Sequence, residues 1–272
     1  MPNWVANCLR FHGSADDMAQ IDVFFKGGID FNDFIHMPEE LNMVEGSNTT
    51  TAILAYLTDY GRKNLAEGAG IGAQHSGNMF FDDATLKRFY EHVPSPSDQY
   101  DFASRSGDKL LMTYAEAGKR YVDNLEKHGA ATWYGWCTEN WGTKWNACDA
   151  SWDGETLVFQ TAWDAPWPII DAVAQRFCSV DILHEWADED EAPYCGAAEY
   201  RGGERISTVI YSGEEGIKAA DRIWESFWRE SDQAEAEISL DGESDDARSA
   251  REAINSGCDI AAHVTVDHRE NR

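Results

Sequence analysis

The sequence contains no long uninterrupted apolar segment. Its longest apolar runs, such as residues 157–159, are far shorter than the roughly 20 residues that a membrane-spanning helix needs. The amino terminus also lacks the basic stretch followed by an apolar stretch that marks a secretory signal. We therefore expect a cytoplasmic protein that has no membrane partner.

Closely spaced cysteines are missing as well. The six cysteines include no Cys-x-x-Cys pair, and the nearest two, Cys137 and Cys148, have ten residues between them. Structural zinc sites draw on ligands spaced about two to four residues apart. We therefore expect reduced thiols and no bound metal.

Catalytic motifs are absent too. The sequence has no G-x-S-x-G elbow, no H-E-x-x-H motif and no glycine-rich loop that ends in Lys-Ser or Lys-Thr. This absence favours a protein without a cofactor that is not an enzyme. The remaining alternative is an enzyme of unrecognised type, for which the neighbourhood of His184, Glu185 and Cys195 is the least implausible site.

Basic residues are scarce. The 272 residues include 49 Asp and Glu against 22 Lys and Arg, a formal net charge of -27. Residues 181–246 alone hold 20 acidic and 5 basic side chains. Because proteins bind nucleic-acid phosphates through clusters of Lys and Arg, we expect no direct nucleic-acid binding. A field of this sign instead attracts basic surfaces.

Three interpretations of this acidity remain open. The first is a solvated surface that like charge keeps soluble. The second is adaptation to high salt, which would suit 26 Asp beside only 8 Lys. The third is imitation of a nucleic-acid backbone, so that the chain occupies a basic host protein as a decoy. The binding residues expected for this third interpretation are acidic: Asp188, Glu189, Asp190, Glu191, Glu214 and Glu215.

The hydrophobic pattern predicts an α+β protein. Residues 4–11 are typical of a strand, and residues 14–25 combine a Ser N-cap with apolar positions at helical spacing. Residues 31–37 are expected to be extended, and residues 48–129 to be helical. Strand patterns return in the second half, followed by a last amphipathic helix that runs past residue 230. The later strands are predicted at 156–163, 180–186, 194–200 and 204–211, the last two forming a hairpin around Gly202 and Gly203.

Tryptophan is concentrated in one segment. Residues 133–167, whose composition is typical of strands, hold seven of the eleven tryptophans. Indole rings suit either a core layer or an exposed recognition surface. Core packing is the ordinary outcome. The alternative is a binding module for a small molecule or a peptide, with a Trp-rich platform of Trp136, Asn140, Trp141, Lys144 and Trp145.

Residues 140–145 read Asn-Trp-Gly-Thr-Lys-Trp, the most specific of several stretches that lie within about residues 1–41 and 133–211. These stretches resemble YubB-like proteins, which phages and conjugative plasmids carry. The resemblance implies a ferredoxin-like antiparallel sheet with packed helices and a mobile-element origin, but no activity, since a fold alone does not define one. The supporting stretches are MPNWVANCLRF at the start, Asp30-Phe31-Asn32, residues 37–41, Phe159-Gln160-Thr161-Ala162-Trp163, residues 166–168 and Tyr194-Cys195-Gly196.

Together these observations predict four regions. Residues 1–41 supply the first β-α-β part of the sheet, residues 48–129 form a helical insertion, residues 130–231 complete the ferredoxin-like domain, and residues 232–272 form an acidic, loosely ordered tail. The favoured function is that of a non-enzymatic protein, encoded by a phage or plasmid, that inhibits a basic host or defence protein through an acidic, nucleic-acid-mimicking surface.

Overall fold

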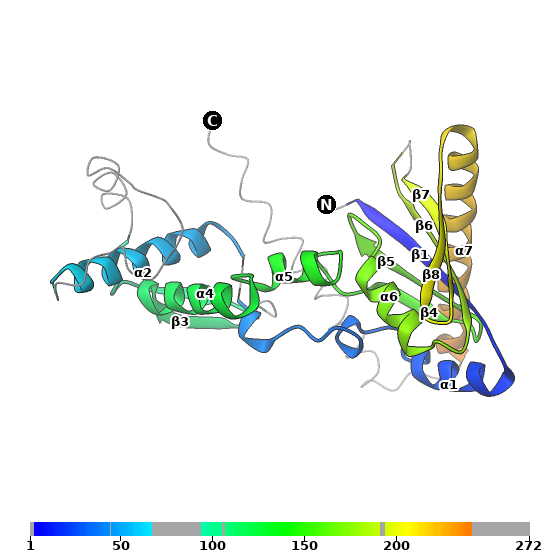
Figure 1. Ribbon diagram of the computed structural model, residues 1–272, viewed down its shortest axis with the longest axis horizontal. Coiled ribbons are helices and arrows are strands. Elements are labelled where there is room, and N and C mark those ends of the chain that lie inside the picture. The colour runs from blue at the N-terminus through cyan, green and yellow to red at the C-terminus, as the bar shows by residue number, and fades with distance from the viewer. Residues whose placement is uncertain (1–2, 44, 67–93, 105–106, 191–193, 241–272) are drawn as a thin grey trace. The chain divides into compact units, whose positions relative to one another are not determined.

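The computed structural model describes residues 3–43, 45–66, 94–104, 107–190 and 194–240 (Figure 1). The chain divides into two compact units. One comprises residues 1–37 and 137–272, and the other comprises residues 38–136. Within the described ranges, no helix has the length and apolar character needed to cross a membrane.

The first unit is built on a six-stranded antiparallel sheet of order β4-β5-β1-β6-β7-β8. β1 lies inside the sheet, paired with β5 on one side and β6 on the other. The strand at the start of the sequence is therefore completed by strands from its second half. The strands are β1 (Trp4–His12), β4 (Cys148–Trp152), β5 (Thr156–Ala162), β6 (Asp181–Asp188), β7 (Cys195–Arg201) and β8 (Glu204–Tyr211).

The connectivity of this sheet is ferredoxin-like. The segments β1-α1-β4 and β5-α6-β6 are two split β-α-β units, each of which receives a strand of the other between its own two strands. The helices are α1 (Ala15–Phe25) and α6 (Trp167–Arg176). The predicted α+β class with a ferredoxin-like antiparallel sheet is confirmed. β7 and β8 extend the sheet beyond β6, in the hairpin that the sequence predicted.

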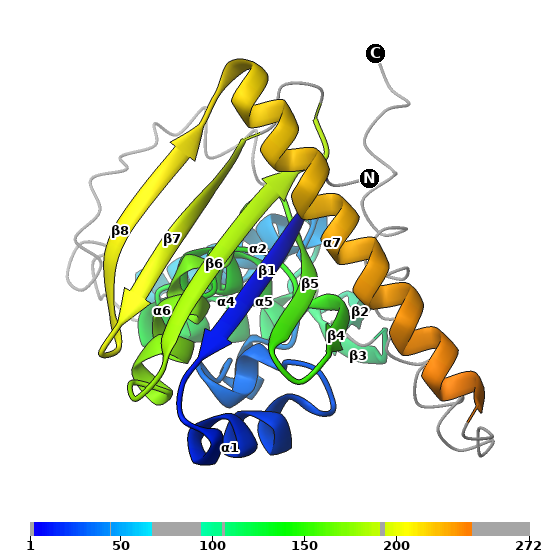
Figure 2. The ribbon, with the colours of Figure 1, turned by 90° about the vertical axis from the view of Figure 1, so that its right-hand side faces the viewer.

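Helices cover both faces of the sheet. Figures 1 and 2 show α1 and α6 on one face and α7 (Gly213–Leu240) crossing the other. The alternation of β1 explains this arrangement, because Phe11 packs against Phe25 of α1 whereas Cys8 points to α7. The cluster beneath α7 consists of buried small and apolar residues: Ala6, Cys8, Val158, Ala187, Cys195, Ala219, Ala220, Ile223 and Phe227.

Two predicted extended segments are helical instead. Residues 31–37 contain a 3-10 turn, η1 (Phe31–Asp33), because the Asp30 carboxylate accepts from the Asn32 N–H at 2.8 Å and Asn146 Oδ1 accepts from the Phe31 N–H at 2.9 Å. A second 3-10 turn, η2 (Glu39–Leu41), follows. Residues 133–140, predicted from their aromatic content to be extended, form helix α5 (Trp133–Asn140). Aromatic residues favour strands only where a sheet surface receives them.

The second unit combines two helices with a small hairpin. It contains α2 (Ser47–Ala66), β2 (Gln99–Ala103), β3 (Lys109–Thr113) and α4 (Tyr114–His128). The hairpin is a departure from the predicted all-helical insertion. α4 begins where it does because Thr113 and Glu116 form a capping box. The core of the unit is made of Met43, Ala52, Ala55, Phe102, Met112, Tyr114, Ala117 and Tyr121.

The predicted tail falls largely outside the described residues. α7 continues to Leu240, so the first part of the predicted tail, from residue 232, is helical. Residues 241–272 lie outside the described ranges, as does Glu191 of the predicted acidic surface.

Candidate functional site

The strand register brings the predicted acidic residues to one end of the sheet. Ala187 near the end of β6 pairs with Cys195 at the start of β7, which pairs with Tyr211 at the end of β8. The acidic residues around the end of β6 and at the start of α7 therefore share one end of the sheet. Asp164, which comes shortly after β5, lies at the same end, because Ala162 at the end of β5 pairs with Trp4 at the start of β1. We call this set the acidic end: Asp164, Asp188, Glu189, Asp190, Glu214 and Glu215.

Two members of the acidic end anchor the first strand. The Trp4 N–H donates to Glu189 Oε1 at 2.9 Å, and the Glu189 N–H donates to the Trp4 carbonyl at 3.1 Å. The Asn3 side-chain amide donates to Asp190 Oδ1 at 2.8 Å. Glu189 and Asp190 thus have definite partners at the start of the chain, next to and within β1.

The carboxylates are crowded enough to perturb one another. Burial, and then the neighbouring Asp188 carboxylate, raise the pKa of Asp164. Burial is also the first cause of the raised pKa of Asp188, and Asp190 and Glu189 add to it. Within the described part of the chain, no lysine or arginine forms an ion pair with any of these four residues. These four carboxylates therefore hold negative charge that a cation from outside would stabilise.

Two exposed aromatic side chains flank these carboxylates. Trp163 is 49% exposed and Tyr194 is 46% exposed. The Tyr194 N–H donates to Asp188 Oδ1 at 2.9 Å, so this residue adjoins the acidic end. Burial, and then the Asp164 carboxylate, raise the pKa of the Tyr194 hydroxyl. Trp163 has a backbone φ of 76°, in the left-handed region that a bulky residue rarely adopts. Its N–H donates to the Asn3 carbonyl at 2.8 Å, which helps to hold this conformation.

Lys144, which lies against the Trp163 ring, is enclosed. Its ammonium group lies 3.7 Å from the centroid of the Trp145 ring and 4.0 Å from that of Trp163. The residue is 4% exposed, and burial lowers its pKa. Trp145 in turn contacts Trp4, with ring centroids 5.8 Å apart. Lys144 is thus sequestered between indole rings.

The predicted Trp-rich platform lies in the interior. Trp141 is fully buried, donates from its indole nitrogen to the Ile35 carbonyl at 2.8 Å and packs edge-on against Phe31. Trp136, Lys144 and Trp145 are also buried, and Asn140 is half-buried at the end of α5. The core alternative for these rings is therefore what the structure contains, and their exposed neighbour is Trp163.

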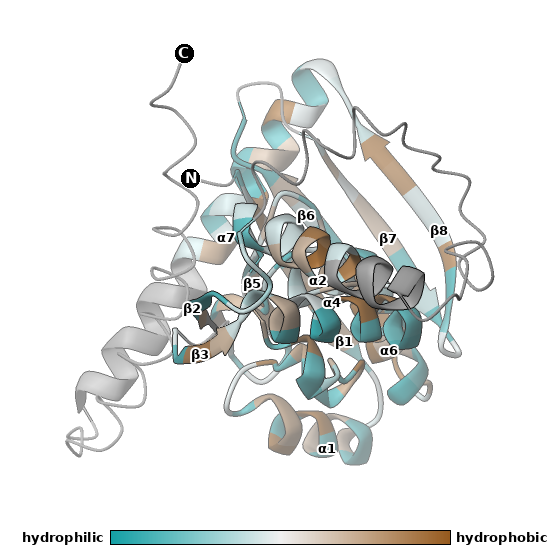
Figure 3. Cartoon of the chain, turned by 90° about the vertical axis from the view of Figure 1, so that its left-hand side faces the viewer, coloured by the Kyte–Doolittle hydropathy of each residue, from teal (hydrophilic) through white to brown (hydrophobic). Residues whose placement is uncertain are grey.

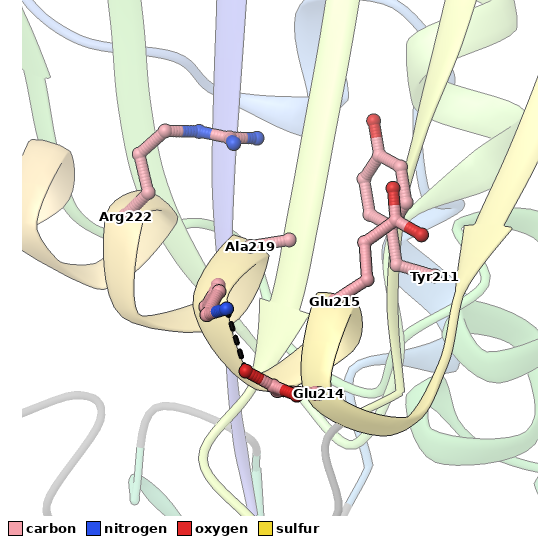
Figure 4. Close-up of a pocket in the computed structure, with 6 residues that line it drawn as sticks. Tyr211, Glu214, Glu215, Ala219 and Arg222 are labelled. Atoms are coloured by element: carbon pink, nitrogen blue, oxygen red, sulfur yellow. Dashed lines mark hydrogen bonds and ion pairs between the residues drawn. The ribbon is translucent and has the colours of Figure 1, made fainter.

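A pocket of about 530 Å³ lies where α7 begins (Figure 4). Lys218 Nζ donates a hydrogen bond to Glu214 at 2.7 Å, and the Arg222 guanidinium donates one to Glu185 at 2.6 Å. Both basic side chains of the pocket therefore already have carboxylate partners. Figure 4 shows Glu215 and Tyr211 among the side chains that line the pocket. The lining residues are Tyr211, Glu214, Glu215, Lys218, Ala219 and Arg222.

The residues of the enzyme alternative do not converge. His184 lies on the α6 face, fully buried, with its Nε2 3.1 Å from Asn7 Oδ1. Glu185, the next residue of the strand, points to the α7 face, where it bonds Arg10 and Arg222. The buried Cys195 thiol contacts the Gly216 carbonyl at 3.3 Å on that second face. Histidine and glutamate are therefore separated by the sheet. Within the described ranges, no group of three His, Cys, Asp or Glu side chains is arranged to hold a metal ion.

Sequence reasoning missed three residues of the site. Trp163, Asp164 and Tyr194 were not among the predicted binding residues. Trp163 and Asp164 directly follow a strand, and Tyr194 directly precedes one, positions at which exposed polar and aromatic side chains collect. That signal was available but is weak on its own.

The fold and site thus define an α+β protein with a ferredoxin-like sheet and an acidic end flanked by aromatic residues. Residues 140–238 match the family model described as the ferredoxin-like domain in Api92-like protein. Among solved structures, the chain is similar to the crystal structure of a protein api92 from Yersinia pseudotuberculosis. The identity is 11%, the match covers 78% of this chain and 99% of that one, and the TM-score is 0.36. A search of curated proteins found no match.

Proposed function

We propose that this chain is a non-enzymatic binding protein whose acidic end occupies a basic surface on a partner protein. The observation that carries the proposal is the crowding of four carboxylates of the acidic end that have no ion-pair partner within the described part of the chain. They are Asp164, Asp188, Glu189 and Asp190. Burial first, and then the neighbouring negative carboxylates, raise the pKa values of Asp164 and Asp188. Positive charge from a partner would remove this repulsion, so association is favoured.

The flanking aromatic residues suit the same partner. An arginine or lysine that enters between carboxylates gains from contact with a ring face, and Trp163 and Tyr194 are about half exposed beside the carboxylates. The net charge of -27 adds long-range attraction toward a basic surface, which raises the association rate. A basic surface with spaced cations is also what nucleic-acid-binding proteins present, so such a protein is the proposed target.

The proposal extends to inhibition. A chain bound at the nucleic-acid site of a host or defence protein would exclude the nucleic acid. The resemblance to YubB-like proteins supports a setting on a phage or plasmid, with action in the cytoplasm of the host cell. Direct contact with nucleic acid or a membrane is not part of the proposal, because the negative field would repel both.

The test compares two variants with equal charge. The first carries Glu189→Gln, Asp190→Asn and Glu215→Gln, which keep side-chain size and an acceptor oxygen at the acidic end. The matched control carries Asp16→Asn, Asp33→Asn and Glu155→Gln, exposed acidic residues elsewhere in the same unit. Each tagged protein captures partners from host lysate, and bound protein is eluted between roughly 0.1 M and 0.5 M salt, over which screening shortens about twofold.

We expect wild type and the control variant to retain a basic partner that the acidic-end variant loses. Duplex DNA should displace this partner from wild type. Elution by salt should accompany this pattern. A partner that binds all three proteins equally, or that neither salt nor DNA displaces, would refute the acidic end as the binding surface.

A further inference from the structure

The two edges of the six-stranded sheet differ in how they are protected. The β4 edge is short, its register with β5 shifts between Cys148 and Ser151, and it carries an acidic residue, Asp149, with a φ of 49°. Irregular pairing and charge of this kind discourage another strand from joining. The β4 edge is therefore protected against pairing with another strand.

The β8 edge is longer and, over most of its length, regular and uncharged. β8 has eight residues, and within the described part of the chain its outer side pairs with no strand. Its irregularity lies at the Arg205 end, and from Ser207 to Tyr211 the pairing with β7 is regular. Figure 3 shows apolar colour on β8 at the outer border of the sheet. Three aliphatic side chains are about half exposed there: Ile206 at 50%, Val209 at 51% and Ile210 at 50%.

The charge of this edge is also exceptional. In a chain of net charge -27, residues 206–211 contain no charged side chain. A strand that pairs with them antiparallel and in the same sequence would place aliphatic and small polar residues opposite one another, with no like charges in register. The edge is therefore complementary to itself.

We propose that β8 is the dimer interface, at which β8 of a second copy pairs antiparallel to make one continuous sheet of twelve strands. An interface of this kind is isologous, because the same strand serves both copies around a two-fold axis. It satisfies the outward backbone groups of both strands and covers the aliphatic side chains on each.

The antiparallel direction follows from charge. The acidic end lies at the Tyr211 end of β8. Antiparallel pairing places the acidic ends of the two copies at opposite ends of the joined sheet, about 27 Å apart for a strand of this length. That separation is well beyond the Debye length of about 8 Å at physiological ionic strength, so the repulsion between the acidic ends is screened. Parallel pairing would bring the two ends together.

Salt separates this interface from the proposed function. Binding of a basic partner at the acidic end weakens as salt rises, whereas pairing of two like-charged copies strengthens, since salt screens their mutual repulsion. The dimer does not depend on the acidic end having a partner, and either proposal can fail without the other.

The experiment measures the mass of the full-length protein in solution by sedimentation equilibrium at about 1–200 µM, a range that covers micromolar dissociation constants. The test variant is Val209→Lys with Ile210→Lys. The control is Ile217→Lys, which alters a residue of similar exposure, 48%, on α7. Circular dichroism confirms that the variants are folded. Hydrogen exchange of residues 204–211 at low and high protein concentration provides a readout on wild type alone.

We expect wild type and control to form a dimer whose dissociation constant falls as salt rises. The double variant should dimerise at least about tenfold more weakly. We also expect slower exchange in residues 204–211 at high concentration. A wild-type monomer throughout the range would overturn the proposal. So would larger open-ended oligomers, or a dimer that the double variant preserves with unchanged exchange in β8.

Discussion

Trp4 and Glu189 exchange hydrogen bonds across the acidic end of the sheet. The Trp4 N–H donates to the Glu189 side chain at 2.9 Å, while the Glu189 N–H donates to the Trp4 carbonyl at 3.1 Å. Trp4 opens β1, and Glu189 directly follows β6. The pair therefore connects the start of β1 to the clustered carboxylates at the end of β6.

This pair predicts a difference between two substitutions of Glu189. Glu189→Ala removes the acceptor of the Trp4 N–H, whereas Glu189→Gln keeps an acceptor oxygen and also removes one of the crowded negative charges. We expect the alanine variant to be less stable than the glutamine variant by about 1 kcal/mol. Urea unfolding at pH 7 measures the difference. Equal stability of the two variants would mean that the side-chain hydrogen bond contributes nothing.

We expect position 163 to favour glycine over alanine, which is unusual for a site that holds tryptophan. Its φ of 76° is unfavourable for any residue with a Cβ atom, whereas glycine adopts it freely. Both Trp163→Gly and Trp163→Ala remove the ring, so they differ mainly in the backbone. We expect the glycine variant to be the more stable by about 1 kcal/mol, from the cost of the left-handed conformation. Thermal unfolding of the two variants decides this, and a more stable alanine variant would contradict it.

His184 predicts sensitivity to acid. Burial, and then the positive charge of Arg205, lower the pKa of His184 to about 3, whereas the unfolded chain has the ordinary value of 6.5. Between these values the unfolded state binds more protons, so stability falls as pH falls from about 6.5 toward 3. We expect a loss of about 1.4 kcal/mol per pH unit from this histidine. His184→Gln should remove this contribution.

The measurement is the urea unfolding free energy of wild type and His184→Gln at pH 7, 6 and 5. The difference between the two proteins isolates the histidine, because other titrating groups are shared. Asp164 and Asp188, for example, have raised pKa values, so their effect on the free energy of unfolding has the opposite sign. The stability that they contribute is lost as pH rises through their folded-state pKa values. Parallel curves for wild type and variant would show that His184 is not the acid-sensitive group.

Gly118 predicts a strong effect of one methyl group in the second unit. A Cβ atom there would lie 2.0 Å from the Ala52 carbonyl oxygen, because α2 and α4 approach closely at this point. We expect Gly118→Ala to destabilise this unit by about 1–3 kcal/mol, since the backbone must move apart. Hydrogen exchange in α2 and α4 is the measurement. The matched control is Gly135→Ala in α5, where the nearest atom would be 3.7 Å away and no loss is expected.

Local signals determined much of the fold. The helix over residues 15–25 was predictable because Ser14 caps its first turn, accepting from the Asp17 N–H, and because Ile21 and Phe25 fall on one face. The β7–β8 hairpin was predictable because two glycines with positive φ, Gly202 and Gly203, form its turn. In each case the residues that decide the structure are neighbours in sequence.

Other segments could not be predicted because distant residues decide them. Asn146 bonds the backbone of Phe31 and helps to turn a segment whose composition is typical of a strand. Trp141 is buried because its indole nitrogen meets the Ile35 carbonyl and its ring meets Phe31. Without those contacts in view, the same tryptophan suits an exposed platform equally well.

The sequence by itself determined the amount of negative charge and the stretches that carry it, since both follow from composition. Only the tertiary structure decided which carboxylates meet. Asp164 follows β5, Glu189 follows β6 and Glu214 opens α7, and they share one end of the sheet because β1 pairs with both β5 and β6 while β7 and β8 continue the register. Pairing between distant strands depends on the whole sheet, and no local pattern specifies it.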